Sequence, residues 1–109
     1  MHHLDKAAEF SPPGPRGVNW TEHLRVPLLS VGTYCVPAGG KDVQTPHTED
    51  EVYVVLGGKG TFVADGQRIA ASTGTVLYVP ANEEHRFVDV TEDLTVLVVF
   101  VPPEYTRQQ

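Results

Sequence analysis

Residues 51–71 read EVYVVLGGKGTFVADGQRIAA, and they decide the fold class. The run 51–56 is rich in β-branched and aromatic residues, which favour strands. The glycine-rich segment 57–60 marks a tight corner. Asp65-Gly66 is the dipeptide that a type I′ hairpin favours, because both of its central residues need a positive φ. This stretch therefore predicts short strands joined by tight turns.

The same pattern of β-prone runs and turn residues continues on both sides of this stretch. We find no convincing amphipathic helix, and about eight strands at regular spacing are typical of a sandwich or barrel. The strands are expected at residues 18–26, 28–36, 51–56, 61–64, 67–71, 74–79, 85–90 and 94–101. Because the last run is apolar on both faces, we expect it to be covered on both sides, by the barrel core and by a second subunit.

The chain has 109 residues, which suits one ordinary domain. The segment Ser11-Pro12-Pro13-Gly14-Pro15 cannot continue a helix or a strand. We therefore expect a flexible N-terminal segment over residues 1–17, a single β-barrel domain over 18–103 and a C-terminal tail over 104–109.

Composition excludes several classes of partner. The formal net charge is -6 and the Lys and Arg residues are scattered, so nucleic acid is not expected. No window reaches the length of a membrane span, and the first ten residues lack the apolar core of a signal peptide. The single cysteine, Cys35, excludes an internal disulfide and is expected to be a buried small hydrophobe. Together these features predict a cytoplasmic protein.

Two acidic clusters contain histidine, and a third histidine, His23, stands alone. One cluster is His47 to Glu51, and the other is Glu83 to His85. Imidazole and carboxylate together suit iron, manganese, nickel or zinc, whereas an all-oxygen set suits magnesium or calcium. A turn between His47 and Glu51 would direct both inward, but only closure of the fold could bring His85 to them. Taken alone, the clusters also fit solvated acidic turns with surface histidines.

A wider pattern favours the metal site. From Gly39 to Gly58 the sequence resembles the first motif of the cupin family: glycine, five residues, His-x-His, three residues, glutamate, six residues, glycine. From Gly74 to Asp89 it resembles the second motif: glycine, five residues, proline, x, glycine, two residues, histidine, three residues, asparagine. The resemblance implies an all-β cupin jelly-roll β-barrel. It also implies one divalent metal ion held by His47, Glu51 and His85, with iron expected first and manganese, nickel or zinc as alternatives.

The departures from the motifs change the expected chemistry. Thr45 stands where the family has its first histidine, so two histidines and one carboxylate remain. Asn82 replaces a glycine and is expected to accept positive φ. Asp89 replaces the final asparagine and is expected to be a strand or turn residue, not a ligand.

Other side chains have simpler interpretations. Glu49 lies two positions from both His47 and Glu51, so in an extended chain its side chain would point to the same side as theirs. It is therefore a candidate fourth ligand, but we expect it to be an exposed carboxylate in a turn. His23 is expected on the surface, and Arg86 is expected to point outward. The aromatic residues are expected to fill the barrel, with one or two forming a pocket wall; these are Tyr53, Phe62, Tyr78, Phe87 and Phe100.

Three functions remain open. The first is a metal-dependent enzyme resembling a non-heme iron dioxygenase, because a two-histidine, one-carboxylate set leaves open coordination positions for substrate and dioxygen. The second is a metal-assisted isomerase, lyase or sugar-modifying protein, and the third is a non-catalytic small-molecule-binding module. Each implies a small, partly polar molecule as substrate or ligand. A homodimer is expected, because residues 18–36 provide two apolar-faced strands whose edges need protection.

Overall fold

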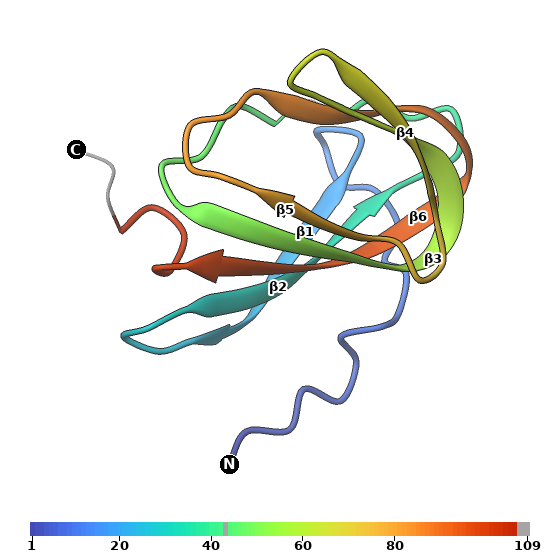
Figure 1. Ribbon diagram of the computed structural model, residues 1–109. Coiled ribbons are helices and arrows are strands. Elements are labelled where there is room, and N and C mark those ends of the chain that lie inside the picture. Colours follow the sequence, from blue (N-terminus) through green and yellow to red (C-terminus); the bar gives the residue numbers. More distant parts are fainter. Residues whose placement is uncertain (43, 107–109) are drawn as a thin grey trace.

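The computed structural model describes residues 1–42 and 44–106. Val43 of the first motif and residues 107–109 of the expected tail lie outside the described residues. Six antiparallel strands form one sheet that curls into a jelly-roll β-barrel, in the order β1-β2-β6-β3-β4 with β5 paired to β3 (Figure 1). The strands are β1 (Asn19–Arg25), β2 (Ser30–Val36), β3 (Asp50–Ala64), β4 (Gln67–Ser72), β5 (Val76–Val79) and β6 (His85–Val101). The described part of the chain contains no helix, so the all-β prediction is confirmed.

The expectation of about eight strands is wrong, because two pairs of predicted strands are single long strands. β3 has 15 residues and spans the runs 51–56 and 61–64, and β6 has 17 residues and spans 85–90 and 94–101. The glycine-rich segment in β3 does not break the pairing with β6. It produces shifts of register between Val55 and Thr61. Such bulges bend a strand without ending it, so the barrel turns its corner inside continuous strands.

The predicted turn chemistry is confirmed at two positions. Asp65 and Gly66 have φ values of 51° and 71°, and they join β3 to β4. Asn82, which replaces the motif glycine, has a φ of 66°. Asparagine tolerates this left-handed conformation better than most residues with a side chain. The turn before β6, which positions His85, therefore keeps the backbone shape that a glycine would give.

The inward side of the barrel is filled as expected, with one exception. Tyr53, Phe62, Phe87 and Phe100 are all buried, and so is Cys35. The exception is Tyr78, which the sequence analysis assigned to the core and which is 63% exposed. Its neighbour Val79 faces inward and is 1% exposed. Because side chains alternate along a strand, Tyr78 must face outward.

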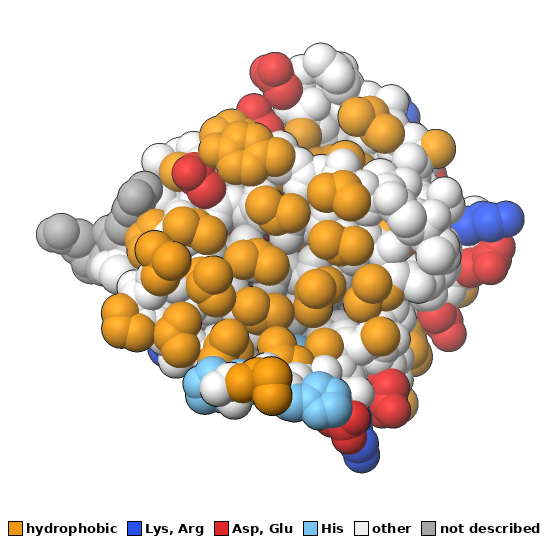
Figure 2. Space-filling view, turned by 60° about the horizontal axis from the view of Figure 1, so that its bottom comes forward, with side chains coloured by type: hydrophobic (Ala, Val, Ile, Leu, Met, Phe, Trp, Pro, Cys, Tyr) orange, Lys and Arg blue, Asp and Glu red, His pale blue; other side chains and the backbone are white. Residues whose placement is uncertain are grey.

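Hydrophobic side chains also dominate one outer face of the molecule (Figure 2). Val76 and Tyr78 on β5 are both more than half exposed, and they pair with Val54 and Val52 on β3. The N-terminal segment lies against β2, which is not a neighbour of β3 or β5 in the sheet. The hydroxyl of Thr33 donates to the carbonyl oxygen of Ala7 at 2.6 Å. The outer side of β3 and β5 is therefore left as an apolar surface.

Residues 1–42 and 44–106 contain no helix with the length and apolar character to cross a bilayer.

Candidate metal centre

The structure brings the three expected ligands together. His47 lies in the turn before β3, Glu51 is the second residue of β3, and His85 is the first residue of β6. One ligand atom from each residue lies within 4.8 Å of the others. The distances are 3.0 Å from Nδ1 of His47 to Oε1 of Glu51, and 3.6 Å from that oxygen to Nε2 of His85. Closure of the barrel thus brings His85 to Glu51, which lies 34 positions earlier in the sequence.

Two buried atoms in this cluster have no hydrogen-bond partner among the described residues. They are Nδ1 of His47 and Oε2 of Glu51. The contact of Nδ1 with Oε1 of Glu51 is a charge contact that does not have the geometry of a hydrogen bond. An unsatisfied buried polar group costs about 1–3 kcal/mol. A divalent cation bound between the two residues would satisfy both atoms, so the donor set fits a metal ion.

His85 is oriented by two hydrogen bonds. Its Nδ1 donates to the carbonyl oxygen of Glu83 at 2.8 Å, which leaves the lone pair on Nε2. The hydroxyl of Tyr53 donates to that Nε2 at 2.8 Å and also lies 3.2 Å from Oε1 of Gln44. Burial, and then the charge of Glu51, raise the pKa of Tyr53 well above its usual value, so its phenol stays protonated. Gln44 would offer the Tyr53 hydroxyl an alternative acceptor if Nε2 of His85 bound a metal.

His47 lies between two carboxylates. Its Nε2 is 3.0 Å from Oε2 of Glu104, on the side of the ring away from Glu51. Burial acts to lower the pKa of His47, but the carboxylates of Glu104 and Glu51 raise it, with a net result of about 9. The ring of His47 is therefore charged at neutral pH, and it would have to lose a proton to bind a metal.

Glu104 is the residue of this site that the sequence analysis missed. It falls in the segment expected to be a C-terminal tail, yet it is only 5% exposed. Its N–H donates to Oγ of Ser30 at 3.0 Å, and the next N–H, that of Tyr105, donates to Oε1 of Glu49 at 3.0 Å. The only local signal is the sequence Pro102-Pro103, which ends the last strand just before this glutamate.

The expectation that Glu49 is an exposed turn carboxylate is wrong. Its relative exposure is 0%, because the segment after β6 folds back over it. Glu49 lies outside the group of ligand atoms found in the described residues. Its carboxylate instead holds the backbone of the segment that carries Glu104.

A cavity of about 420 Å³ opens beside the cluster. Both His47 and Glu104 line it, as does Thr45, the residue at the position of the missing histidine. Five aromatic side chains form another part of its lining: Trp20, Tyr34, Tyr53, Phe100 and Tyr105. A mostly apolar cavity of this size with a few polar groups suits a small organic molecule.

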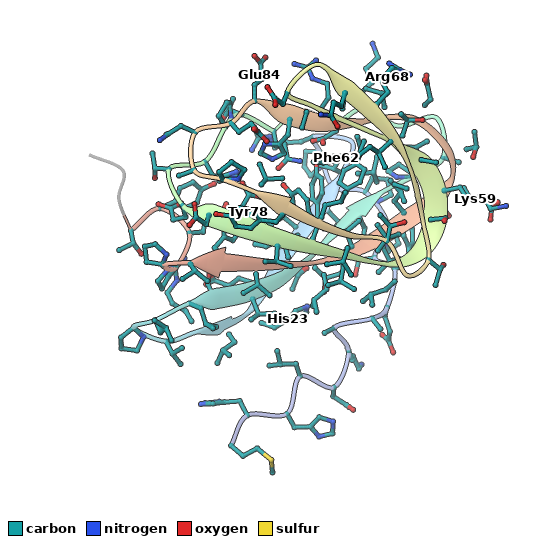
Figure 3. The ribbon with its side chains drawn as sticks, viewed as in Figure 1. His23, Lys59, Phe62, Arg68, Tyr78 and Glu84 are labelled. Carbon is teal, nitrogen blue, oxygen red and sulfur yellow. The ribbon has the colours of Figure 1, made fainter. Side chains whose placement is uncertain are left out.

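The remaining candidates lie away from the cluster. Nε2 of His23 forms a 2.7 Å hydrogen bond with Oγ1 of Thr33. Figure 3 shows His23 outside the barrel, whereas Phe62 lies inside it. Asp89 forms an exposed ion pair with Arg68 at 2.8 Å, in agreement with its expected role as a non-ligand. Arg86 is exposed, as predicted.

The antiparallel jelly-roll barrel, with a histidine–glutamate–histidine cluster facing its interior, defines a small single-barrel protein with a candidate metal site. Residues 32–101 match the family model described as the cupin domain. The chain therefore belongs to the cupin family.

Relatives and solved structures agree with this assignment. The chain is 44% identical over 85 residues to an uncharacterized protein of Streptomyces coelicolor, which covers 78% of this chain and 81% of that protein. An RmlC-like cupin protein from Desulfovibrio desulfuricans superposes with a TM-score of 0.72 at 26% identity, covering 94% of this chain and 96% of the other. A predicted oxalate decarboxylase from Thermotoga maritima superposes with a TM-score of 0.66 at 23% identity, covering 77% and 79%. This last similarity concerns the fold alone.

Proposed function

We propose that this cupin is a metal-dependent enzyme that acts on a small, partly polar molecule in the manner of a non-heme iron dioxygenase. The observation that carries the proposal is the position of the cluster. His47, Glu51 and His85 present two unsatisfied buried atoms, and His47 also forms part of the wall of a cavity large enough for a small substrate.

The residues around the cavity suggest how a substrate would be held. An iron(II) ion held by His47, Glu51 and His85 would have room to bind both a substrate and dioxygen, and would supply the oxidation chemistry. Tyr53 offers a neutral hydroxyl donor beside His85. Thr45 and Gln44 add polar groups to the wall, while Trp20 and Phe100 provide apolar surface that excludes water. Such a cavity would accept a molecule with one polar end and one flat apolar part.

A second candidate function is metal-assisted isomerisation or elimination, and manganese, nickel or zinc would serve it as well as iron. The observation that favours it is the group of proton-holding side chains along the cavity. His47 and Glu104 are in contact at 3.0 Å, and Tyr53 lies on the same wall. Groups of this kind can move a proton next to a carbonyl oxygen that a metal polarises. A non-catalytic binding module would bind the same molecules without turnover.

The test combines metal analysis with activity measurements. Protein purified without chelators is analysed for metal, loaded anaerobically with iron(II), and supplied with panels of carbonyl, phenolic and thiol compounds. Oxygen uptake with product formation supports the dioxygenase proposal. Conversion without oxygen uptake would favour the isomerase or lyase, and binding without conversion would favour the module. The variant His47→Ala, treated in the same way, measures conversion that does not need the site.

Thr45→His distinguishes the first two mechanisms. The new imidazole would restore the fourth family ligand at a position on the cavity wall. We expect tighter metal binding and a loss of most oxygen-dependent activity, because one of the two adjacent open positions is filled. Competition with a chromophoric chelator measures the affinity, and oxygen uptake measures the activity. Unchanged affinity would mean that residue 45 does not face the metal, and intact oxygenation at raised affinity would contradict the dioxygenase mechanism.

We also propose that the protein is a homodimer that buries the apolar outer face of β3 and β5. Val76 and Tyr78 are 62% and 63% exposed there, and a second copy supplies an apolar surface of matching chemistry. The double variant Val76→Lys and Tyr78→Lys should shift the mass from dimer to monomer in light scattering at micromolar concentration. Ile69→Lys, on β4, is the matched control and should leave the dimer intact. A monomeric wild-type protein would contradict the proposal.

A further inference from the structure

We propose that Glu104 is a positioning residue that fixes the tautomer and the ring orientation of His47, so that the segment after the last strand completes the metal site. The inference rests on the proposed metal site and adds to it a residue outside both sequence motifs. It starts from the 3.0 Å contact between Oε2 of Glu104 and Nε2 of His47.

The contact determines which nitrogen of His47 can bind a metal. Both ring nitrogens lie 3.0 Å from a carboxylate oxygen, which only accepts hydrogen bonds. A cation bound beside Glu51 would displace the proton of Nδ1, and the proton of Nε2 would stay beside Glu104. The lone pair of the neutral ring is then on Nδ1. That atom lies 3.0 Å from Oε1 of Glu51 and is buried without a hydrogen-bond partner. Glu104 therefore selects the tautomer whose free nitrogen faces the other two ligands.

Two buried side chains hold the backbone around Glu104 in place. The N–H of Glu104 donates to Oγ of Ser30, and the N–H of Tyr105 donates to the carboxylate of Glu49. Ser30 and Glu49 are both 0% exposed. The carboxylate is thus fixed through its backbone. This arrangement differs from a surface ion pair, in which long side chains lose entropy and little stability is gained.

The ring of His47 also packs against two aromatic rings, both in a tilted arrangement. Its centroid lies 4.8 Å from that of Phe100 and 6.2 Å from that of Tyr105. These contacts limit the tilt of the ring, but they do not determine which nitrogen points to Glu51. The choice between the two ring orientations depends on the polar partner at the far nitrogen, which is Glu104.

The proposal predicts a measurable loss of metal affinity. Removing the carboxylate that holds a ligating histidine typically costs 10–100-fold in affinity. We therefore expect metal-free Glu104→Ala to bind Zn²⁺ about 10–100-fold more weakly than the wild type in a calorimetric titration. Glu104→Gln keeps an acceptor oxygen for the Nε2 proton and should recover most of this loss. Glu92→Ala removes an exposed glutamate that pairs with Lys59, and it should bind Zn²⁺ like the wild type.

Nitrogen-15 NMR of the zinc-loaded protein reports the tautomer directly. The wild type and Glu104→Gln should show a proton on Nε2 of His47 and the metal on Nδ1. In Glu104→Ala this proton should exchange faster or the tautomer should change. A merely structural role of Glu104 would lower the thermal stability of the metal-free protein without changing this signal.

Three results would overturn the inference. One is an unchanged Zn²⁺ affinity in Glu104→Ala, and another is a wild-type ring that binds zinc through Nε2. The third is a Glu104→Gln variant as weak as Glu104→Ala, since this would make Glu104 a direct ligand. His47→Ala and His85→Ala in the same titration separate this inference from the proposed site. If both bind Zn²⁺ like the wild type, the site itself is wrong; if they lose it while Glu104→Ala does not, only the role of Glu104 is wrong.

Discussion

Replacing His47 or His85 with alanine should reduce bound metal from about one equivalent to well below stoichiometric levels. Each variant removes one of the three proposed ligands, so its effect should exceed the roughly 10–100-fold loss typical of an outer hydrogen-bonding partner. The measurement is metal analysis of protein purified without chelators, followed by titration of the metal-free protein. If the three proposed ligands hold the metal together, each single variant should lose almost all of the bound metal.

His23→Ala is the matched control for this experiment. His23 is also a histidine with a side-chain hydrogen bond, but it lies outside the barrel and its partner is Thr33. Its replacement should leave the metal content unchanged. If both site variants retained a full equivalent of metal, the assignment of His47, Glu51 and His85 would be withdrawn.

Gly58→Ala should destabilise the metal-free barrel by on the order of 3 kcal/mol or more. Gly58 has a φ of 92°, a conformation that residues with a side chain rarely adopt. A Cβ atom there would lie 2.1 Å from the carbonyl oxygen of Asp93 and 2.8 Å from Cα of Leu94. Both atoms belong to the backbone of β6, so no flexible side chain can move aside. Chemical denaturation of the metal-free variant measures the change in the free energy of unfolding.

Gly57→Ala provides a control one residue away. A Cβ atom at this position would meet nothing within 4 Å. We expect the free energy of unfolding to change by less than about 1 kcal/mol. Equal losses in the two variants would contradict the close approach of Gly58 to β6, and would point instead to a general need for flexibility in this segment.

The sequence predicted the barrel class and the three clustered residues for separate physical reasons. Turn residues such as Asp65-Gly66 require a particular backbone conformation, so the hairpin is encoded locally. His47 and Glu51 are close in sequence, and a turn directs both side chains inward. His85 could be added only through its resemblance to the second motif, because local spacing does not relate it to β3.

Several features depended on packing that no local pattern encodes. The corner at residues 57–60 resembles a loop, but pairing with β6 continues through it, so two predicted strands are one. Glu49 and Glu104 look like exposed carboxylates because acidic residues usually are. Their burial results from the return of the C-terminal segment over the barrel. Only the folded structure shows that Glu104 and Tyr105 return to the barrel.

The pairing of β2 with β6 has a consequence for biosynthesis. Ser30 pairs with Phe100, so two central neighbours in the sheet are separated by most of the chain. Such nonlocal pairing makes folding slow, because the entropy of closing the long loop is lost before the contacts form. On the ribosome the barrel cannot close until β6 has emerged. His85 is the first residue of β6, so the three candidate ligands come together only after this strand has paired with β3.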